Sequence, residues 1–215
     1  MLRDISNLRK SYSKNTLDEK DLPKDPFFLF DNWFKFESKK NSFSEINAMT
    51  LSTIDSSGFP NSRIVLLKYY SSDGFVFFTN YNSNKAMSID KINKVSISFF
   101  WENSERQIMI KGTARKISDD LSTKYFDSRP LGSKIGALVS ENQSSIIESK
   151  QFLIQRFNDL KNKYLNRKIE RPSYWGGYII NPIEYEFWQG GKNRIHDRIR
   201  YKKINRYWQK NRLSP

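Results

Sequence analysis

The feature that most constrains the fold is a two-residue period of apolar side chains that begins near Asn47. Turn sequences such as Asp55-Ser-Ser-Gly58 separate short runs with this pattern. The runs cover residues 48–54, 62–70, 75–79, 95–101, 107–117, 177–181, 185–189 and 194–203, and a last one surrounds Trp208. Alternation with short connections is typical of antiparallel strands. The pattern therefore predicts an antiparallel, barrel-like sheet rather than a doubly wound parallel one.

Helices are few and peripheral in this reading. Asp25-Pro26 supplies an N-cap and a first-turn proline for a helix that reaches about Lys39. Further helices are expected over residues 85–92, after Ser118, and from the capping box Ser145-Ile-Ile-Glu148 to about residue 165. Residues 1–24 lack apolar periodicity and are typical of a mobile arm. We expect that arm, over residues 1–24, followed by a single domain over residues 25–215.

The composition excludes several kinds of site. The chain has no Cys and one His, which rules out disulfides, thiolate nucleophiles and a multi-His metal site within one chain. Its densest apolar runs are far shorter than a membrane span, and its first residues contain no apolar h-region. We therefore expect no metal, no secretory signal and no membrane partner.

The net charge is +14, and its excess lies mostly near the C-terminus. Residues 192–212 carry nine Lys or Arg residues and one acidic residue, Asp197. Apolar and aromatic side chains run through the same stretch, which favours packed strands displaying cations over a solvated basic tail. A charge of this sign points to an anionic partner without identifying it.

Two segments in the first half of the chain combine cations with a strand or a turn. In Arg63-Ile-Val-Leu-Leu-Lys68, strand alternation places the two cations on opposite faces, where they would serve different groups, unless both lie at strand ends in solvent. In Thr79-Asn-Tyr-Asn-Ser-Asn-Lys85, a hydroxyl and a Lys lie beside a predicted helix start. Such a place can hold a phosphate, although a plain turn with an N-cap has the same sequence.

Three further segments carry groups suited to binding. Tyr125 and Arg129 are four residues apart, and with Ser133 they form a phenol, guanidinium and hydroxyl set suited to a phosphate, unless Arg129 only caps a helix. Gln107, in Glu105-Arg-Gln107, offers paired donor and acceptor groups to a heterocycle or belongs to an exposed turn. Arg194, His196 and Arg198 are expected on one face of a strand after a tight Gly190-Gly191 hairpin turn. Three cationic groups on one face favour an anionic or electron-rich ligand.

Taken together, these segments resemble those of the pyridoxamine 5′-phosphate oxidase family, and the resemblance covers nearly the whole chain, from Arg9 to Pro215. The motifs that carry the resemblance occur in the family's order. They are Arg63–Lys68, Phe78-Thr-Asn80, Ser83-Asn-Lys-Ala86, Glu105-Arg-Gln107, Tyr125-Phe-Asp-Ser-Arg-Pro130, Gln143-Ser144, Tyr174-Trp-Gly-Gly177 and Glu186–Arg198.

The resemblance implies an α+β class and an antiparallel split β-barrel of the FMN-binding type with peripheral helices. It implies FMN as cofactor, a cytoplasmic homodimer with FMN at the subunit interface, and C-terminal strands that serve dimerisation and substrate binding. The implied reaction oxidises pyridoxamine 5′-phosphate and pyridoxine 5′-phosphate to pyridoxal 5′-phosphate with O2, in vitamin B6 cofactor biosynthesis or salvage. It releases H2O2, and ammonia from the amine.

The resemblance also assigns residues. The substrate falls to Lys68, Tyr125, Arg129, Ser133, Arg194 and His196, with Arg9 and Tyr12 as a lid and with Arg194 and His196 nearest the chemistry. The FMN contacts are Arg63, Ile64, Val65, Leu66, Leu67, Lys68, Phe78, Thr79, Lys85, Gln107, Gln143, Ser144, Trp188 and Arg198.

The chain departs from the family pattern at a few positions. Asn84 stands where an Arg is usual, which removes one cation expected at the FMN phosphate and predicts weaker FMN retention. Asn82 replaces a usual Gly, and Lys10 replaces a common Arg of the lid. Two other interpretations stay open from the sequence: a different split-barrel flavoprotein, and a basic nucleic-acid-binding module with aromatic stacking residues.

Overall fold

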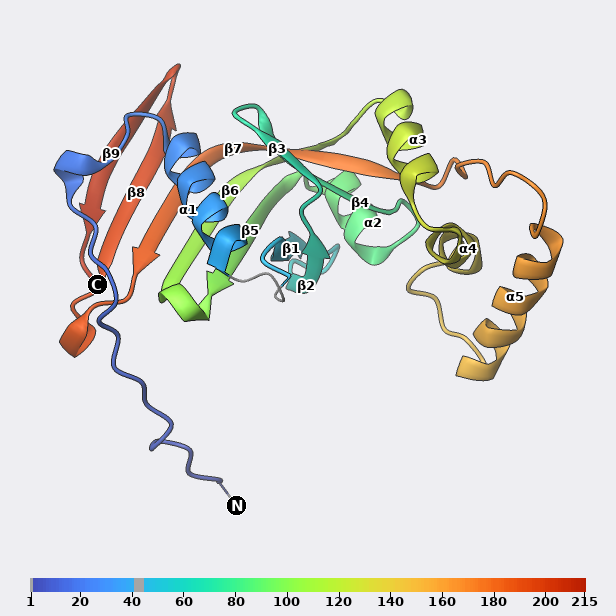
Figure 1. The fold of residues 1–215 in the computed structure, drawn as a ribbon, viewed down its shortest axis with the longest axis horizontal. Helices are drawn as coiled ribbons and strands as arrows, with labels where there is room; N and C mark the ends of the chain where they lie inside the picture. Colours follow the sequence, from blue (N-terminus) through green and yellow to red (C-terminus); the bar gives the residue numbers. More distant parts are fainter. Residues whose placement is uncertain (1, 41–44) are drawn as a thin grey trace. The chain divides into compact units, whose positions relative to one another are not determined.

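The computed structural model describes residues 2–40 and 45–215 and divides the chain into two compact units. Unit 1 comprises Met1–Met49, Ser96–Lys111 and Pro182–Pro215, and unit 2 comprises Thr50–Val95 and Gly112–Asn181. Figure 1 shows the helices and strands of both units. The helices are α1 (Pro26–Lys40), α2 (Asn84–Lys91), α3 (Asp119–Ser128), α4 (Leu131–Val139) and α5 (Lys150–Lys163), with 3-10 turns η1 (Glu19–Asp21), η2 (Glu102–Ser104) and η3 (Lys192–Arg194).

The strands form one hydrogen-bonded sheet, and the pairs with a described register are antiparallel. The neighbours follow the order β2-β1-β5-β6-β7-β4-β3, and β8 pairs with both β7 and β9. The strands are β1 (Ala48–Ile54), β2 (Pro60–Leu66), β3 (Tyr69–Ser71), β4 (Gly74–Asn80), β5 (Lys94–Trp101), β6 (Arg106–Lys116), β7 (Trp175–Gln189), β8 (Asp197–Ile204) and β9 (Tyr207–Leu213). The antiparallel sheet with peripheral helices predicted from the alternation is therefore present. In the described part of the chain, no helix has the length and apolar character needed to cross a membrane.

Helix α1 covers the sheet of unit 1. Its Phe30 ring lies 5.4 Å from the ring of Phe99 on β5, and its Trp33 ring lies 5.4 Å from Phe187 on β7. In Figure 1 the helix runs in front of these strands. Both helix residues are buried, so the apolar stripe of α1 supplies much of the core of this unit.

The start of α1 follows the sequence signal. Pro26 is the first helical residue, and the Asp25 carboxylate accepts a hydrogen bond from the Phe27 amide at 2.9 Å. This geometry satisfies one of the amides that a helix start leaves unpaired. The helix is thereby fixed directly after the arm.

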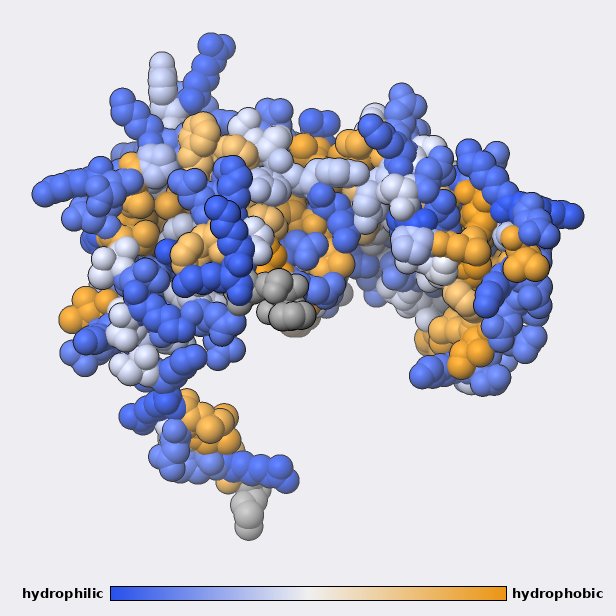
Figure 2. Space-filling view, viewed as in Figure 1, coloured by the Kyte–Doolittle hydropathy of each residue, from blue (hydrophilic) through white to orange (hydrophobic). Residues whose placement is uncertain are grey.

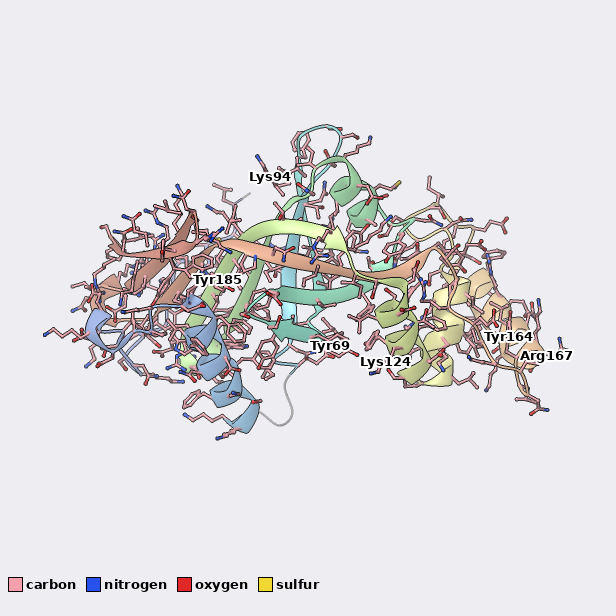
Figure 3. All side chains as sticks on the ribbon, turned by 90° about the horizontal axis from the view of Figure 1, so that it is seen from above. Tyr69, Lys94, Lys124, Tyr164, Arg167 and Tyr185 are labelled. Atoms are coloured by element: carbon pink, nitrogen blue, oxygen red, sulfur yellow. The ribbon has the colours of Figure 1, made fainter. Side chains whose placement is uncertain are left out.

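Unit 2 joins the hairpin of β3 and β4 to the first half of β7. Phe78 on β4 lies opposite Gly177 on β7, and Thr79 lies opposite Gly176. A Cβ on Gly177 would come within 2.5 Å of the Ile117 side chain, so only glycine allows the strand to lie this close. Helices α3, α4 and α5 pack together beside this hairpin around a cluster that includes Phe126, Ile135 and Trp175. Figure 3 labels Tyr69 of β3, Lys124 of α3 and Tyr164 in this unit.

Strand β7 is continuous where two strands were predicted, over residues 177–181 and 185–189. Its residues 175–180 pair with β4, and its residues 184–189 pair with β8. Pro182 lies between these two ladders, where its missing N–H breaks neither of them. A proline that looks like a strand boundary in the sequence thus marks the place where one strand changes partner.

The predicted start of α5 at Ser145 is wrong. The helix begins at Lys150, and its N-cap is Ser149, whose side chain accepts from the Phe152 amide at 3.1 Å. Ser144 has a left-handed backbone with φ of 80°, and the Ser145 amide bonds back to Asn142. The chain is still turning at the predicted capping box, so the helix starts four residues later.

Candidate active site

A cavity of about 720 Å³ in unit 2 collects most of the predicted cofactor and phosphate residues. They come from β2, the residues after it, β4, α2 and the α3–α4 region. Those that line the cavity are Arg63, Ile64, Val65, Leu66, Lys68, Phe78, Thr79, Lys85, Tyr125, Arg129, Ser133 and Gln143. A volume of this size suits a cofactor or a drug-sized ligand. We call this cavity the cationic pocket.

The charge of the cationic pocket is one-sided. Among its described lining residues, four are cations, Arg63, Lys68, Lys85 and Arg129, and none is acidic. Burial and then the neighbouring charge of Arg63 lower the pKa of Lys85 to about 8. Cations held together without a carboxylate are costly in the free protein, so they favour an anionic ligand.

Neutral groups orient the cations at one end of the pocket. Arg63 donates to the Thr53 hydroxyl at 2.8 Å and to the Leu51 carbonyl at 3.3 Å. Lys85 donates to the Thr79 hydroxyl at 3.3 Å and to the Gln143 side chain at 3.5 Å. None of these acceptors carries a charge, so both positive charges remain available to a phosphate.

The other end of the pocket is formed where α3 ends. Arg129 is the C-cap of α3, and its amide donates to the Phe126 carbonyl. Its Nη1 is buried without a hydrogen-bond partner among the residues that the structure describes, and burial also lowers the pKa of its guanidinium. Buried donors in native proteins are nearly always paired, so an orphaned guanidinium nitrogen beside Tyr125 marks the place of an acceptor that a ligand would supply.

The Arg129 guanidinium lies on an aromatic shelf formed by Trp175, Phe78 and Tyr125. Trp175 had no predicted role. The Arg129 guanidinium lies 4.5 Å from the centre of the Trp175 ring. Trp175 stacks on Phe78 at 5.5 Å, and Phe78 stacks on Tyr125 at 3.9 Å. A cation over an indole face is favourable and held in direction. The motif Tyr174-Trp-Gly-Gly177 was visible in the sequence, but only the fold brings Trp175 under Arg129.

Two predicted cofactor residues of unit 2, Leu67 and Ser144, lie outside the cationic pocket. Leu67 is buried and follows the end of β2, so it belongs to the core. Ser144 lies in the loop before α5, where its hydroxyl accepts from the Asn84 amide at 3.3 Å. That bond places Ser144 against the start of α2, beside the Lys85 end of the pocket.

A second cavity, of about 630 Å³, lies within unit 1 and collects the predicted lid and ring-binding residues. Arg9, Tyr12, Arg194 and His196 all line it. The Tyr12 ring meets the ring of Trp188 edge-on at 5.5 Å and that of His196 at 5.9 Å. The arm and the segment after β7 therefore form one site, which we call the arm cavity.

The His196 ring is fixed by a backbone contact. Its Nδ1 accepts a hydrogen bond from the Gly191 amide at 3.1 Å. A neutral imidazole that accepts at Nδ1 carries its proton on Nε2. The ring therefore offers an N–H donor at Nε2 to whatever enters the arm cavity.

The predicted strand with Arg194, His196 and Arg198 on one face is wrong. Strand β8 begins at Asp197, and Arg194 ends the 3-10 turn η3 with a left-handed φ of 63°. Gly190-Gly191 is not a tight two-residue turn either, because the connection continues to His196. The left-handed residues interrupt the alternation, so only Arg198 lies on the strand.

Arg198 has a different environment from the other two. Its Nε donates to the Glu186 carboxylate at 2.8 Å, and its Nη1 donates to the Ser214 carbonyl at 2.8 Å. Gln107, a half-buried residue of β6, and Trp188 complete the predicted cofactor residues of unit 1. None of these three is among the described residues that line the arm cavity.

Comparison with known proteins shows which family the chain belongs to. Residues 37–164 match the family model described as pyridoxamine 5′-phosphate oxidase, and residues 175–215 match the pyridoxine 5′-phosphate oxidase C-terminal dimerisation region. The chain belongs to the pyridoxamine 5′-phosphate oxidase family. Curated relatives named pyridoxine/pyridoxamine 5′-phosphate oxidase are 48% identical in Flavobacterium psychrophilum, over all of both chains, and 49% identical in Flavobacterium johnsoniae, over 99% of this chain and 100% of the relative.

Solved structures agree with this family. PhzG from Burkholderia lata, solved with tetrahydrophenazine-1-carboxylic acid, has a TM-score of 0.87 at 26% identity over 94% of this chain and 100% of its own. A pyridoxamine 5′-phosphate oxidase-related, FMN-binding protein from Nostoc punctiforme has a TM-score of 0.71 at 15% identity, over 90% of this chain and all of its own. The predicted split-barrel fold is confirmed. Membership of the pyridoxamine 5′-phosphate oxidase family supports an oxidoreductase with a flavin cofactor, and the matched dimerisation region supports the predicted homodimer.

Proposed function

We propose that this chain oxidises pyridoxamine 5′-phosphate and pyridoxine 5′-phosphate to pyridoxal 5′-phosphate with FMN and O2, in vitamin B6 cofactor biosynthesis or salvage. The products besides the aldehyde are H2O2 and, from the amine, ammonia. The names of the full-length relatives support this substrate class. The observation that carries the proposal is the cationic pocket. Within the described ranges 2–40 and 45–215, its four cations face no acidic lining residue and its Arg129 Nη1 has no partner.

The residues present fit FMN, which would supply the two-electron redox chemistry. Arg63 and Lys85 would hold its phosphate, because both keep an uncompensated charge. The main chain and side chains of residues 64–68, with Phe78 and Thr79, would line the rest of its site. Gln107, Gln143, Ser144, Trp188 and Arg198 complete the set that we propose for FMN.

The substrate would be held at both of its ends. Arg129, Tyr125, Ser133 and Lys68 would bind its phosphate, since Arg129 already lies beside Tyr125 on the aromatic shelf. Arg194 and His196 would orient the pyridine ring and the reacting carbon. The Nε2–H of His196 would donate to the substrate, because Nδ1 already accepts a hydrogen bond from the Gly191 amide. Arg9 and Tyr12 would cover the substrate and exclude water.

We further propose that FMN lies at the interface of the homodimer. The loop that follows Gln143 and Ser144 exposes Ile146 fully and Ile147 by nearly half, and Phe152 in the first turn of α5 is also exposed by nearly half. Figure 2 shows apolar surface gathered over α4 and α5. Large apolar side chains grouped at one place favour a covering partner, here a second copy of the chain. A cytoplasmic location stays a prediction.

The test is direct. The protein is purified and its absorbance spectrum is recorded for bound flavin, whose identity is read by chromatography after denaturation. Pyridoxamine 5′-phosphate is then added in air, and pyridoxal 5′-phosphate and H2O2 are measured in equal amounts if the proposal holds. A colourless protein that takes up no FMN, or a flavoprotein that leaves this substrate unchanged, would contradict it.

A further inference from the structure

Glu105 holds the N-terminal arm by a contact that the sequence reading did not anticipate. One oxygen of its carboxylate, Oε2, accepts from the Ser13 amide at 2.8 Å and from the Lys14 amide at 3.0 Å. Glu105 is only 2% exposed, whereas Ser13 and Lys14 lie at the surface. A buried carboxylate that accepts two backbone amides is a strong, directional contact. Because both donors are backbone amides, the contact fixes the main chain of the arm independently of the arm's side chains.

The backbone of Glu105 also holds the end of β7. Its carbonyl accepts from the Gly190 amide at 2.8 Å and from the Gln189 side chain at 3.1 Å. The residue has a left-handed conformation, with φ of 54° and ψ of 42°, which is uncommon for Glu and costs free energy. In this conformation its carbonyl bonds to the end of β7 while its carboxylate bonds to the arm.

The anchored amides adjoin the residue that faces His196. Tyr12 directly precedes Ser13, and its ring lies against the rings of Trp188 and His196. The fit is close, because a Cβ on Gly190 would come within 2.7 Å of the Tyr12 Cβ. The anchor at Ser13 and Lys14 thus sets where Tyr12 lies in the arm cavity.

We propose that Glu105 is a positioning residue for substrate binding, which acts by anchoring the arm so that Arg9 and Tyr12 cover the arm cavity. It contacts neither of them through its carboxylate, and it reaches the substrate only through the arm. The inference rests on the proposed function of Arg9 and Tyr12 as the cover. Without the carboxylate, water satisfies the two amides, and the arm loses the contact that fixes its main chain at Ser13 and Lys14.

The experiment uses the full-length, FMN-loaded protein and the variants Glu105→Gln and Glu105→Ala. We expect Glu105→Ala to raise the KM for pyridoxamine 5′-phosphate about tenfold, and Glu105→Gln to raise it less, because the amide oxygen still accepts without the charge. The Kd for FMN should change less than about twofold. In a second measurement, without substrate, tryptic cleavage after Lys14 should become about tenfold faster in Glu105→Ala, since the docked arm protects that bond.

Two further variants separate anchoring from general damage to the fold. Glu102→Gln removes an exposed carboxylate of the neighbouring turn, which pairs with Lys10 at 3.4 Å, and it should change KM and cleavage less than about twofold. Ser13→Pro deletes one of the two amide donors. If the anchor acts as proposed, Glu105→Gln has a smaller effect in the Ser13→Pro background than in the wild type.

The outcomes are distinguishable. Wild-type cleavage rates in Glu105→Gln, Glu105→Ala and Ser13→Pro would overturn the anchor. Faster cleavage with unchanged KM would overturn its role in substrate binding. Additive effects of Glu105→Gln and Ser13→Pro would also overturn it, even if Glu105→Ala folds poorly. If the wild type does not oxidise the substrate, the proposed function fails, and the cleavage rates still decide the anchor by themselves.

Discussion

The cationic pocket of unit 2 and the C-terminal strands of unit 1, which begin directly after His196 of the arm cavity, differ in how their cations are paired. In the pocket, Arg63, Lys85 and Arg129 bond to neutral groups or to none, and the pKa of Lys85 falls to about 8. On β8 and β9 of unit 1, by contrast, two arginines are compensated by carboxylates of the same chain. Arg198 pairs with Glu186 at 2.8 Å, and Arg212 pairs with Glu19 and Asp197.

The pairing in unit 1 ties the arm to the C-terminal strands. The hydrogen bonds from Arg212 lower the pKa of Glu19 to about 2, and Arg212 also donates to the Leu17 carbonyl. Part of the positive charge near the C-terminus is thus used to dock residues 17–19. The comparison teaches that net charge is a poor guide to anion binding, because the four cations that gather in one cavity, Arg63, Lys68, Lys85 and Arg129, all lie outside the strongly basic C-terminal segment.

The largest expected effect tests the pocket side of this comparison. Replacing Arg129 by Ala should raise the KM for pyridoxamine 5′-phosphate about 100-fold and leave kcat within about threefold, because a buried phosphate would lose its main charged partner. Steady-state kinetics with saturating FMN measure both parameters. Lys124→Ala, an exposed cation on the same helix and outside the lining residues, serves as control and should behave like the wild type. An unchanged KM in Arg129→Ala would show that the pocket does not hold the substrate phosphate.

A smaller effect, of a different kind, is expected at the arm cavity. Arg194 is exposed and would orient the ring rather than hold the phosphate, so Arg194→Ala should lower kcat as well as raise KM, with a fall in kcat/KM of about 30-fold. Lys192→Ala changes an exposed cation of the same turn that does not line the cavity, and it should leave both parameters near wild type. If kcat is unchanged in Arg194→Ala, the two regions do not differ in role as proposed.

The pH dependence of FMN binding provides a third test of the uncompensated charge. The pKa of Lys85 is lowered to about 8, so its proton is lost as the pH rises through that value in the free protein. A bound phosphate would keep the proton on, so the Kd for FMN should rise about tenfold from pH 7 to pH 9. Flavin fluorescence titrations measure it. Lys85→Arg should remove most of this rise, because Arg stays charged, and an equal rise in that variant would assign the effect to another group.

Local sequence signals predicted much of the sheet and the pocket. Alternation located most of the strands. Tyr125 and Arg129, which were predicted to share a phosphate, both line one cavity, although Arg129 is the C-cap of α3 rather than a residue of the helix. These features depend on neighbours in the chain, so a single sequence contains them. The family resemblance then linked segments such as Arg63–Lys68 and Gln143, which are far apart in sequence.

The features that the sequence did not reveal depend on contacts between distant segments. The left-handed residues Asn193 and Arg194 break a strand pattern that looks regular, and nothing local marks them. Trp175 becomes the shelf of Arg129 only when β7 lies beside α3. Glu105 looks like part of an exposed turn until the arm, more than 90 residues earlier, docks on it.

The smallest expected effect concerns Asn84, where the resemblance to the family implies an arginine. Asn84 is exposed at the first position of α2, one residue before Lys85. Asn84→Arg should lower the Kd for FMN about two- to fivefold, since an exposed pair contributes roughly 0.5–1 kcal/mol. A cation at a helix start opposes the helix dipole, so thermal stability without FMN should fall slightly while affinity rises. Asn84→Gln controls for side-chain length without charge, and the gain of the Arg variant should shrink in high salt. An unchanged Kd would show that the phosphate is already neutralised by Arg63 and Lys85, and that the pocket's missing cation is no weakness.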